Sequence, residues 1–396
     1  RIPTGIRRVR SQASKARVAA AMKAKEAAGM AGLEVMVMKE RATPKDAFVL
    51  NRGEYDKPGE KVERKLPAVL PPLPAGEPNN RLGFARWLVN GQHPLTGRVW
   101  VNRAWERLFG TGLVKTSENF GSQADWPSHP ELLDWLAVDF VERKWDIKDM
   151  LKFIMMSRAY RQSAAVTPDK LEKDPENRLV SRGPRFRLSA ETIRDQALAT
   201  SGLLIPKIGG PSVRPYQPEG LYKGIVVDAP YPSTTWELGK GDELYRRSLY
   251  TFWKRTVPHP AMLTFDSPDR EFCSARRSRT NTPLQALVLW NETGYLESSR
   301  KLAERMLKDG GADDAARTSF AFRLATGRAP RPAETEVLVR TLAKLRADFS
   351  ARPDDAAKLV KVGASVPDPT LPAVELAAAA GVANLILTLD ETITKN

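Results

Sequence analysis

The chain has 396 residues, of which 42% are hydrophobic and 28% charged, so it is long enough to bury a substantial core as a soluble globular protein. Lys and Arg number 62 against 47 acidic residues, which gives a formal net charge of +15. This charge favours anionic partners, among them glycans, acidic proteins, lipid headgroups and nucleic acid, and does not choose between them.

The cysteine and histidine content excludes several cofactor and metal sites. Cys273 is the only cysteine, so neither an internal disulfide nor a thiolate metal cluster can form. The C-x-x-C-H sequence that attaches a c-type haem is absent. His93, His129 and His259 each precede a proline, and no two of them have the i, i+4 spacing of a helical metal site. We therefore predict no metal site and no cofactor in this chain.

The termini and the apolar runs bear on membranes and export. No stretch of about 18 or more apolar residues occurs, and the best candidate, residues 376–389, contains Gly381 and Asn384. We therefore expect no transmembrane segment. The chain starts without Met and without an apolar signal segment, so we expect a fragment whose natural amino terminus lies upstream.

The amino-terminal part is expected to be separate from the rest. Residues 7–29 are basic and rich in alanine and predict a helix, and β-like runs follow at 33–38 and 48–50. Prolines crowd the segment from Pro58 to Pro78 and are expected to block regular structure. We therefore predict an upstream tail with a proline-rich linker over residues 1–78 and a helical domain over residues 79–396.

Helical periodicity dominates from Asn80 onward, so the predicted fold class is mainly α, with long loops rich in proline and glycine and a small β element near the amino terminus. Predicted helix caps are Asn80, Asp146 and Ser189. Two capping boxes are also predicted, Ser128 with Glu131 and Thr282 with Gln285.

Two segments interrupt the helical pattern. Residues 206–243 hold many prolines and glycines and predict a long loop, a feature that is usually functional or disordered. Residues 247–254 are apolar and aromatic and fit a buried strand or a short helix equally well. Three tryptophans, Trp87, Trp105 and Trp135, fall in amphipathic helices and are predicted to be core residues.

An arginine-rich segment before the helix predicted at Pro283 is the main candidate binding site. The candidate anion-binding residues are Arg276, Arg277, Arg279, Thr280, Asn281 and Thr282. Guanidinium groups match the geometry of carboxylate, sulfate and phosphate, and the first amides of a helix also donate to anions. The alternative is that these arginines, together with Arg270, pair with Asp266, Asp269 and Glu271 and hold the loop onto the helix.

Other polar candidates are Arg98, Asn102, Arg103, His129 and Asp266. Arg98 and Asn102 share one face of a predicted helix with Glu106, an arrangement more typical of a solvated or interhelical hydrogen-bonded face. His129 lies in the first turn of a helix, where it would stay neutral and could act as a base or simply pack beside Trp126. Asp266 with Asp269 suggests glycoside hydrolysis only if the folded chain sets the required carboxyl separation.

Several long strings resemble one protein family. They include NRLGFARWLV from Asn80, TGRVWVNRAWERLFGTGLV from Thr96, FGSQADWPSHPELLDWLA from Phe120 and RRSRTNTPLQALVLWN from Arg276. Together they resemble the planctomycete domain of unknown function 1553, also called PSD-one, over most of the chain from Asn80 onward. The segment before Pro78 resembles the tail of a linker to an upstream domain of unknown function 1549.

The resemblance implies a context for the protein. Members are expected to be periplasmic or secreted, and many carry an upstream cytochrome c-like domain, so haem c is expected on an upstream domain of the same polypeptide. No catalytic residue is established for the family. The leading hypothesis is a module of such an exported protein that binds an anionic polysaccharide or an acidic protein. The alternatives are a glycan-active hydrolase or redox enzyme, with its pocket under residues 206–243, and nucleic-acid binding, which export disfavours.

Overall fold

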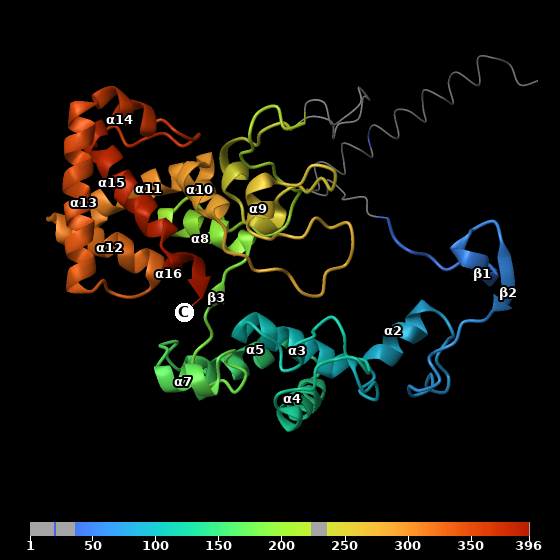
Figure 1. The fold of residues 1–396 in the computed structure, drawn as a ribbon. Helices are drawn as coiled ribbons and strands as arrows, with labels where there is room; N and C mark the ends of the chain where they lie inside the picture. The colour runs from blue at the N-terminus through green and yellow to red at the C-terminus, as the bar shows by residue number, and fades with distance from the viewer. Residues whose placement is uncertain (1–19, 21–35, 223–235, 396) are drawn as a thin grey trace, which may run out of the picture. The chain divides into compact units, whose positions relative to one another are not determined.

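A computed structural model describes residue 20, residues 36–222 and residues 236–395. The helix predicted over 7–29 and the start of the β-like run at 33–38 therefore fall outside the described residues, apart from residue 20. The chain divides into two compact units, one ending at Arg86 and one beginning at Trp87. Figure 1 shows that helices dominate, so the prediction of a mainly α fold is confirmed.

The first unit contains a small antiparallel hairpin. β1 (Ala47–Leu50) pairs with β2 (Pro58–Val62), and the 3-10 helix η1 (Asn51–Gly53) lies in the connection. The prediction for residues 48–50 is confirmed, whereas residues 36–38 form no strand. The expectation that Pro58 blocks regular structure is wrong, because a proline is tolerated as the first residue of an edge strand.

Helix α2 (Arg81–Val89) follows the proline-rich segment. Asn80 caps it as predicted, because its Oδ1 accepts hydrogen bonds from the backbone N–H groups of Leu82 and Gly83 at 3.0 and 3.1 Å. The cap satisfies two amides that have no partner within the helix.

The second unit begins with a lobe of short helices, here called the α3–α7 lobe. It contains α3 (Thr96–Phe109), α4 (Pro130–Glu142), α5 (Ile147–Met156), α6 (Arg158–Arg161) and α7 (Pro168–Lys173). Its first three helices enclose an apolar core made of Val101, Trp105, Leu113, Val114, Leu133, Leu136, Phe140, Met150 and Ile154. The lobe therefore has an apolar centre of its own.

Two predictions for this lobe are wrong. The Ser128–Glu131 capping box does not form, because α4 begins at Pro130 with His129 in the capping position, one residue later than predicted. A proline in the first turn sets this entry point. Trp135 is 51% exposed and is not a core residue, whereas Trp87 and Trp105 are buried as predicted. The predicted Asp146 cap is confirmed, since its side chain accepts from the Asp149 amide.

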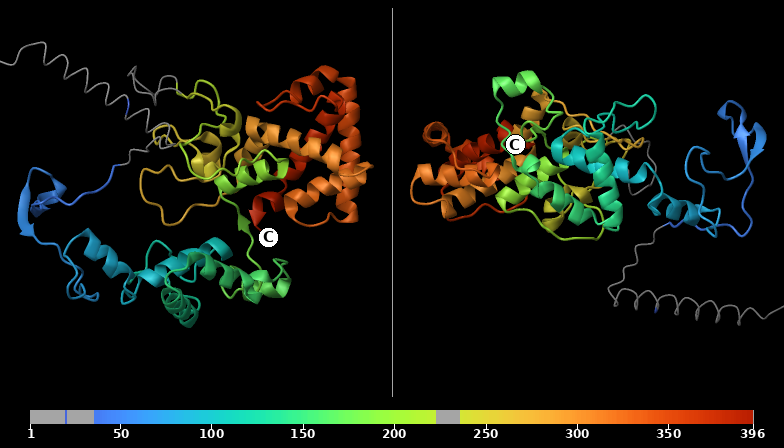
Figure 2. Two further views of the ribbon diagram at one scale, coloured as in Figure 1. Left: turned by 180° about the vertical axis from the view of Figure 1, so that it is seen from behind. Right: turned by 90° about the horizontal axis from the view of Figure 1, so that it is seen from below.

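The rest of the second unit is a helical bundle. Its helices are α8 (Ala190–Ser201), α9 (Pro260–Thr264), α10 (Pro283–Asn291), α11 (Thr293–Asp309), α12 (Asp314–Thr326), α13 (Pro332–Ala351), α14 (Pro353–Leu359), α15 (Ala373–Thr388) and α16 (Asp390–Ile393). Ser189 caps α8 as predicted. Figures 1 and 2 show α15 inside the bundle, where it packs against both α11 and α13. Its buried alanines, Ala377 to Ala380, let these neighbours approach closely.

Residues 206–222 and 236–254 connect α8 to α9 mostly without regular structure. Two 3-10 helices, η2 (Gly241–Tyr245) and η3 (Ser248–Tyr250), interrupt them. Val213 pairs with this segment, donating from its N–H to the Tyr250 carbonyl and accepting from Phe252 N–H, both at 2.7 Å. Residues 247–254 thus combine a helical turn with one isolated bridge.

A second small sheet, which the sequence did not predict, joins distant parts of the second unit. β3 (Phe186–Arg187) pairs antiparallel with β4 (Thr394–Lys395), with Phe186 opposite Lys395. The Leu188 N–H extends the pairing with a 3.0 Å bond to the Ile393 carbonyl. This pairing brings Lys395 beside the segment that leads from the α3–α7 lobe into α8.

Candidate functional site

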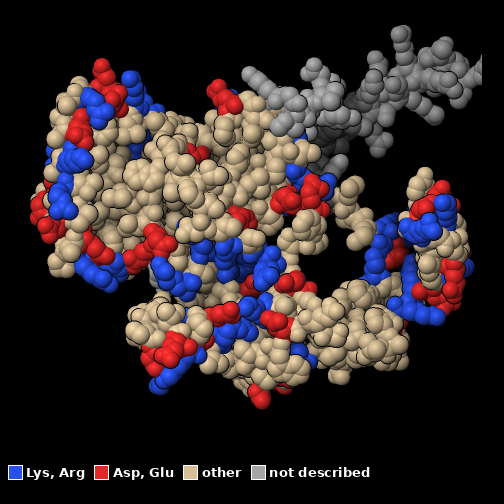
Figure 3. Space-filling view, viewed as in Figure 1, with Lys and Arg blue, Asp and Glu red and all other residues tan. Residues whose placement is uncertain are grey.

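The second unit has a cleft of about 320 Å³ between the α3–α7 lobe and the bundle, here called the basic cleft. Its walls come from the end of α3, from β3 and β4, and from the loop before α10. Seven cationic side chains line it, together with two carboxylates: Arg103, Arg107, Arg187, Arg276, Arg277, Arg279 and Lys395, with Glu106 and Asp266. Figure 3 shows Lys and Arg side chains gathered in this part of the second unit.

Two of these cations are held by rings and carbonyl groups. The Arg279 guanidinium donates to the Gly110 carbonyl at 2.7 Å and lies 4.4 Å from the centre of the Phe186 ring. The Lys395 ammonium donates to the Leu108 carbonyl at 2.8 Å and to the Tyr160 hydroxyl at 2.6 Å. Within the described residues neither forms an ion pair, so their charges remain available to a ligand.

Arg276 and Arg277 do have acidic partners. Arg277 binds both oxygens of Glu191, on α8, at 3.0 and 2.8 Å. Burial of the Glu191 carboxyl opposes its ionisation, but hydrogen bonds, including those from Arg277, outweigh this and lower its pKa. Arg276 pairs with Glu118 at 3.3 Å, where both side chains are exposed. Arg277 is therefore fixed in place, and Arg276 is only weakly held.

The side-chain contacts that hold the loop before α10 differ from those that the sequence suggested. Asp266 accepts from the Thr280 N–H at 2.7 Å and from its hydroxyl, so its partner is a threonine. The arginine partners Glu118 and Glu191 come from distant segments, and the suggested pairing with Asp266, Asp269 and Glu271 is wrong for Arg276 and Arg277.

The start of α10 contributes less to the cleft than the arginines do. Thr282 occupies the capping position but makes no side-chain cap, so the Thr282–Gln285 box does not form. Gln285 instead donates to the Thr264 carbonyl and to Thr280 Oγ1, both at 3.0 Å. Asn281 is exposed, and neither it nor Thr282 lines the cleft.

Of the other polar candidates, Arg103 and Asp266 line the basic cleft, and three lie elsewhere. Arg98 pairs with Asp134 at 2.6 Å. Asn102 is fully buried and bonds both the N–H and the carbonyl of Val114. His129 Nδ1 lies 3.0 Å from the Ser128 hydroxyl. These contacts give Arg98 and Asn102 structural roles inside the α3–α7 lobe.

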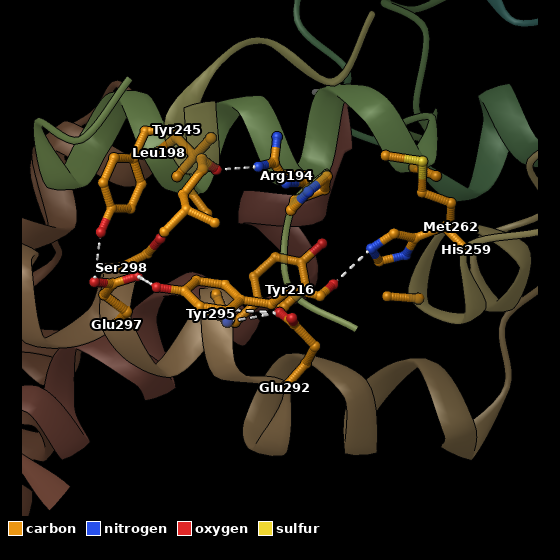
Figure 4. Close-up of a pocket in the computed structure, with 16 residues that line it drawn as sticks. Arg194, Leu198, Tyr216, Tyr245, His259, Met262, Glu292, Tyr295, Glu297 and Ser298 are labelled. Carbon is orange, nitrogen blue, oxygen red and sulfur yellow. Dashed lines mark hydrogen bonds between the residues drawn. The ribbon is translucent and has the colours of Figure 1, made fainter. Parts of the chain in front are cut away.

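A second, smaller cavity lies beside residues 215–216 and 244–245, next to the long connection. Figure 4 shows polar residues around it, among them Arg194, His259, Glu292 and Glu297. The hydroxyls of Tyr216 and Tyr245 donate to Glu297, both at 2.9 Å. Burial lowers the pKa of His259 to about 4, so this imidazole is neutral at physiological pH. The cavity measures about 20 Å³, which is room for roughly one water molecule and far too little for a sugar.

The described part of the chain contains neither a metal-binding cluster nor a membrane-spanning helix. Within residues 36–222 and 236–395, no cluster of three or more His, Cys, Asp or Glu side chains is arranged to bind a metal ion. None of the described helices is both long and apolar enough to cross a bilayer.

Several residues of the basic cleft, among them Arg103 and Arg276, lie within the strings that carry the family resemblance. The family model described as PSD1, Protein of unknown function (DUF1553), matches residues 80–342. The chain belongs to this family. No curated protein and no solved structure matches it significantly. The PSD1 match includes Arg103 to Leu108 and Arg276 to Arg279, whereas Lys395 lies beyond it.

Several residues of the cleft were not among the candidates from the sequence, notably Arg107, Tyr160, Phe186 and Lys395. Lys395 and Leu108 are separated by 287 positions, so no local pattern could have joined them. The only available signal was the high overall content of arginine and lysine, which does not say where these side chains gather.

Proposed function

We propose that this protein is the polysaccharide-binding module of an exported multidomain protein and holds an acidic glycan in the basic cleft. One observation carries the proposal: seven cationic side chains line the cleft against two carboxylates. Counting the partners Glu118, Glu191 and Asp390 as well still leaves an excess of positive charge. A bound carboxylate or sulfate would relieve the repulsion between these cations.

The size and rigidity of the cleft support the same ligand class. A volume of about 320 Å³ lies at the lower end of the range for small-molecule sites, and it suits one or two sugar units better than a folded protein surface. Rings and carbonyl groups already orient Arg279 and Lys395, so binding costs little side-chain entropy. Export and an upstream haem domain belong to this proposal on the strength of the family resemblance alone.

The first test is charge reversal in the cleft. We expect the Arg107→Glu, Arg279→Glu double variant to bind an acidic polysaccharide about 100-fold more weakly, because two charged contacts become repulsive. The matched control is Arg323→Glu with Arg340→Glu, which changes the net charge equally at exposed positions on α12 and α13. Titration calorimetry at low and moderate salt measures both.

The control distinguishes binding in the cleft from a general attraction to the basic surface. If both double variants lose affinity to the same extent, binding is a diffuse attraction to the basic surface and the cleft proposal fails. Competition by a neutral glycan, by an acidic protein or by nucleic acid at equal strength would likewise contradict a site for an acidic glycan.

The second test depends on the protonation state of the Lys395 amine. Burial lowers the pKa of this ammonium to about 8, so the cleft loses one positive charge as the pH rises through that value. We expect polyanion affinity to fall between about pH 7 and pH 9, and binding near pH 8.5 to take up protons, because a bound anion favours the charged amine. Tyr160, Glu106, Arg107 and Arg279 also border this side of the cleft.

Calorimetry in buffers with different ionisation enthalpies measures this proton uptake. The Lys395→Met variant is the control, and we expect its affinity to be nearly independent of pH over the same range. If the wild-type chain and the variant respond to pH in the same way, Lys395 does not face the ligand.

A further inference from the structure

Tyr160 and Lys395 are in contact inside the basic cleft. The binding of an anion does not by itself require this contact. The Lys395 Nζ lies 2.6 Å from the Tyr160 hydroxyl and 3.9 Å from the centre of its ring. Both side chains line the cleft. The antiparallel pairing of β3 with β4 places Lys395 directly opposite Phe186, which fixes the start of its side chain.

The surroundings of the pair suit a group that exchanges protons. Lys395 forms no ion pair within the described residues, and burial lowers its pKa to about 8. At pH 7 roughly a tenth of the amine is therefore neutral, and about half is neutral at pH 8. In the neutral amine, the two N–H groups can serve the Leu108 carbonyl and the Tyr160 hydroxyl, so the nitrogen lone pair is free of both. Burial raises the pKa of Tyr160, which keeps this phenol protonated as a potential acid.

A cation that could hold a substrate carboxylate lies beside the pair. Phe186 lies 4.4 Å from the Arg279 guanidinium carbon and 5.7 Å from the Lys395 ammonium, so one ring supports both cations. A substrate carboxylate held by Arg279 would lie in the same cleft as Lys395, next to the ring that both cations share. Neutralising a carboxylate makes the proton on its α-carbon easier to remove.

We propose that the basic cleft is the active site of a lyase that cleaves polysaccharides of uronic acids by β-elimination, with Lys395 as the base and Tyr160 as the acid. This inference rests on the proposed glycan binding and adds a reaction to it. The binding proposal can stand without it.

The reaction balances without water or an oxidant. Neutral Lys395 takes the proton from the carbon that bears the carboxylate, and that bonding pair forms a double bond to the neighbouring carbon. The bond from this neighbour to the glycosidic oxygen breaks, and the departing oxygen takes the Tyr160 proton. Protonated Lys395 then returns its proton to the Tyr160 phenolate across the 2.6 Å contact. The products are a shortened chain and a chain that ends in an unsaturated uronate.

The closeness of acid and base predicts which sugars react. Because Lys395 and Tyr160 are in direct contact, they approach the sugar ring from one side. The proton and the glycosidic oxygen must then lie on the same face of the ring, as they do in mannuronate and glucuronate. They lie on opposite faces in guluronate and galacturonate. Polymannuronate and polyguluronate are therefore a matched pair, since they carry the same charge and differ only at the carbon that bears the carboxylate.

The experiment incubates the full chain with each polymer and follows the ultraviolet absorbance of the unsaturated uronate. We expect absorbance to grow with polymannuronate and not with polyguluronate. Lys395→Met and Tyr160→Phe should each slow product formation by about 100-fold or more, the usual contribution of general acid–base catalysis. Thermal unfolding and polymer binding check that each variant is folded and still holds the glycan.

A pH profile separates a catalytic Lys395 from a positioning one. As the base, it should make the rate rise as the pH approaches about 8, opposite in direction to the affinity. Three results would overturn the inference: binding of both polymers without product, equal cleavage of both polymers, or full activity in the two variants. The first of these leaves the binding module intact, whereas a chain that binds no polyuronate removes both proposals.

Discussion

The Arg300→Met variant is expected to lower the free energy of unfolding by about 3–5 kcal/mol, the usual cost of removing one partner from a buried ion pair. Arg300 is 1% exposed and lies on α11, inside the bundle. It donates to Glu304 Oε1 at 2.7 Å and to the Ser365 carbonyl at 2.7 Å, and it lies 3.8 Å from Glu297. Removing it leaves the buried Glu297 carboxylate without its nearest positive charge.

Arg340→Met is the control for this prediction. Arg340 pairs with Glu336 at 3.9 Å on the exposed face of α13, and we expect a loss below about 0.5 kcal/mol, because water screens such pairs. Chemical denaturation of both variants measures the difference. Equal effects would mean that the Arg300 network contributes no more than a surface pair.

The Phe140→Ala variant is expected to lose about 3–5 kcal/mol, because it opens a cavity in the core of the α3–α7 lobe. Phe140 is 1% exposed and stacks on Trp100, with ring centres 4.1 Å apart, and it meets Trp145 edge-on at 5.2 Å. Val138→Ala on the same helix is the control, since Val138 is 56% exposed and its removal should change stability by less than about 0.5 kcal/mol.

Hydrogen exchange of the Phe140→Ala variant tests whether the lobe is destabilised separately from the bundle. The core of the lobe and the core around α11 and α15 share no residue. We therefore expect Phe140→Ala to reduce protection in α3, α4 and α5 while α11 and α15 keep theirs. Equal loss in both regions would show that lobe and bundle unfold together. Glycan binding should weaken as well, because α3 carries Arg103 and Arg107 into the basic cleft.

The sequence predicted elements well where the signal was local. Asn80, Asp146 and Ser189 cap helices as predicted, because a capping side chain contacts amides two or three positions along the chain. The two predicted capping boxes failed for different reasons. Helix entry at Pro130 puts His129 in the capping position in place of Ser128. Thr282 does take the capping position, but its side chain makes no cap bond and Gln285 donates to Thr264 and Thr280 instead.

The candidate site was predicted in part. The string from Arg276 to Arg279 stood out because the arginines are adjacent in sequence, and the structure places these arginines in the basic cleft. Their acidic partners could not be predicted, since Glu191 lies 86 positions from Arg277. Composition showed an excess of cations but gave no means of locating Arg107 and Lys395 beside them.

The sequence by itself determined the helical fold class, the limits of several helices, the basic character of the surface and the family. These depend on periodicity, on capping within a turn and on composition, all of which can be read along the chain. Only the tertiary structure decided which charges lie together and which are neutralised. The basic cleft and the Tyr160–Lys395 pair exist because β3 pairs with β4, two short strands more than 200 positions apart. Strands of two residues have no periodicity, so their pairing depends on the packed helices that bring them together.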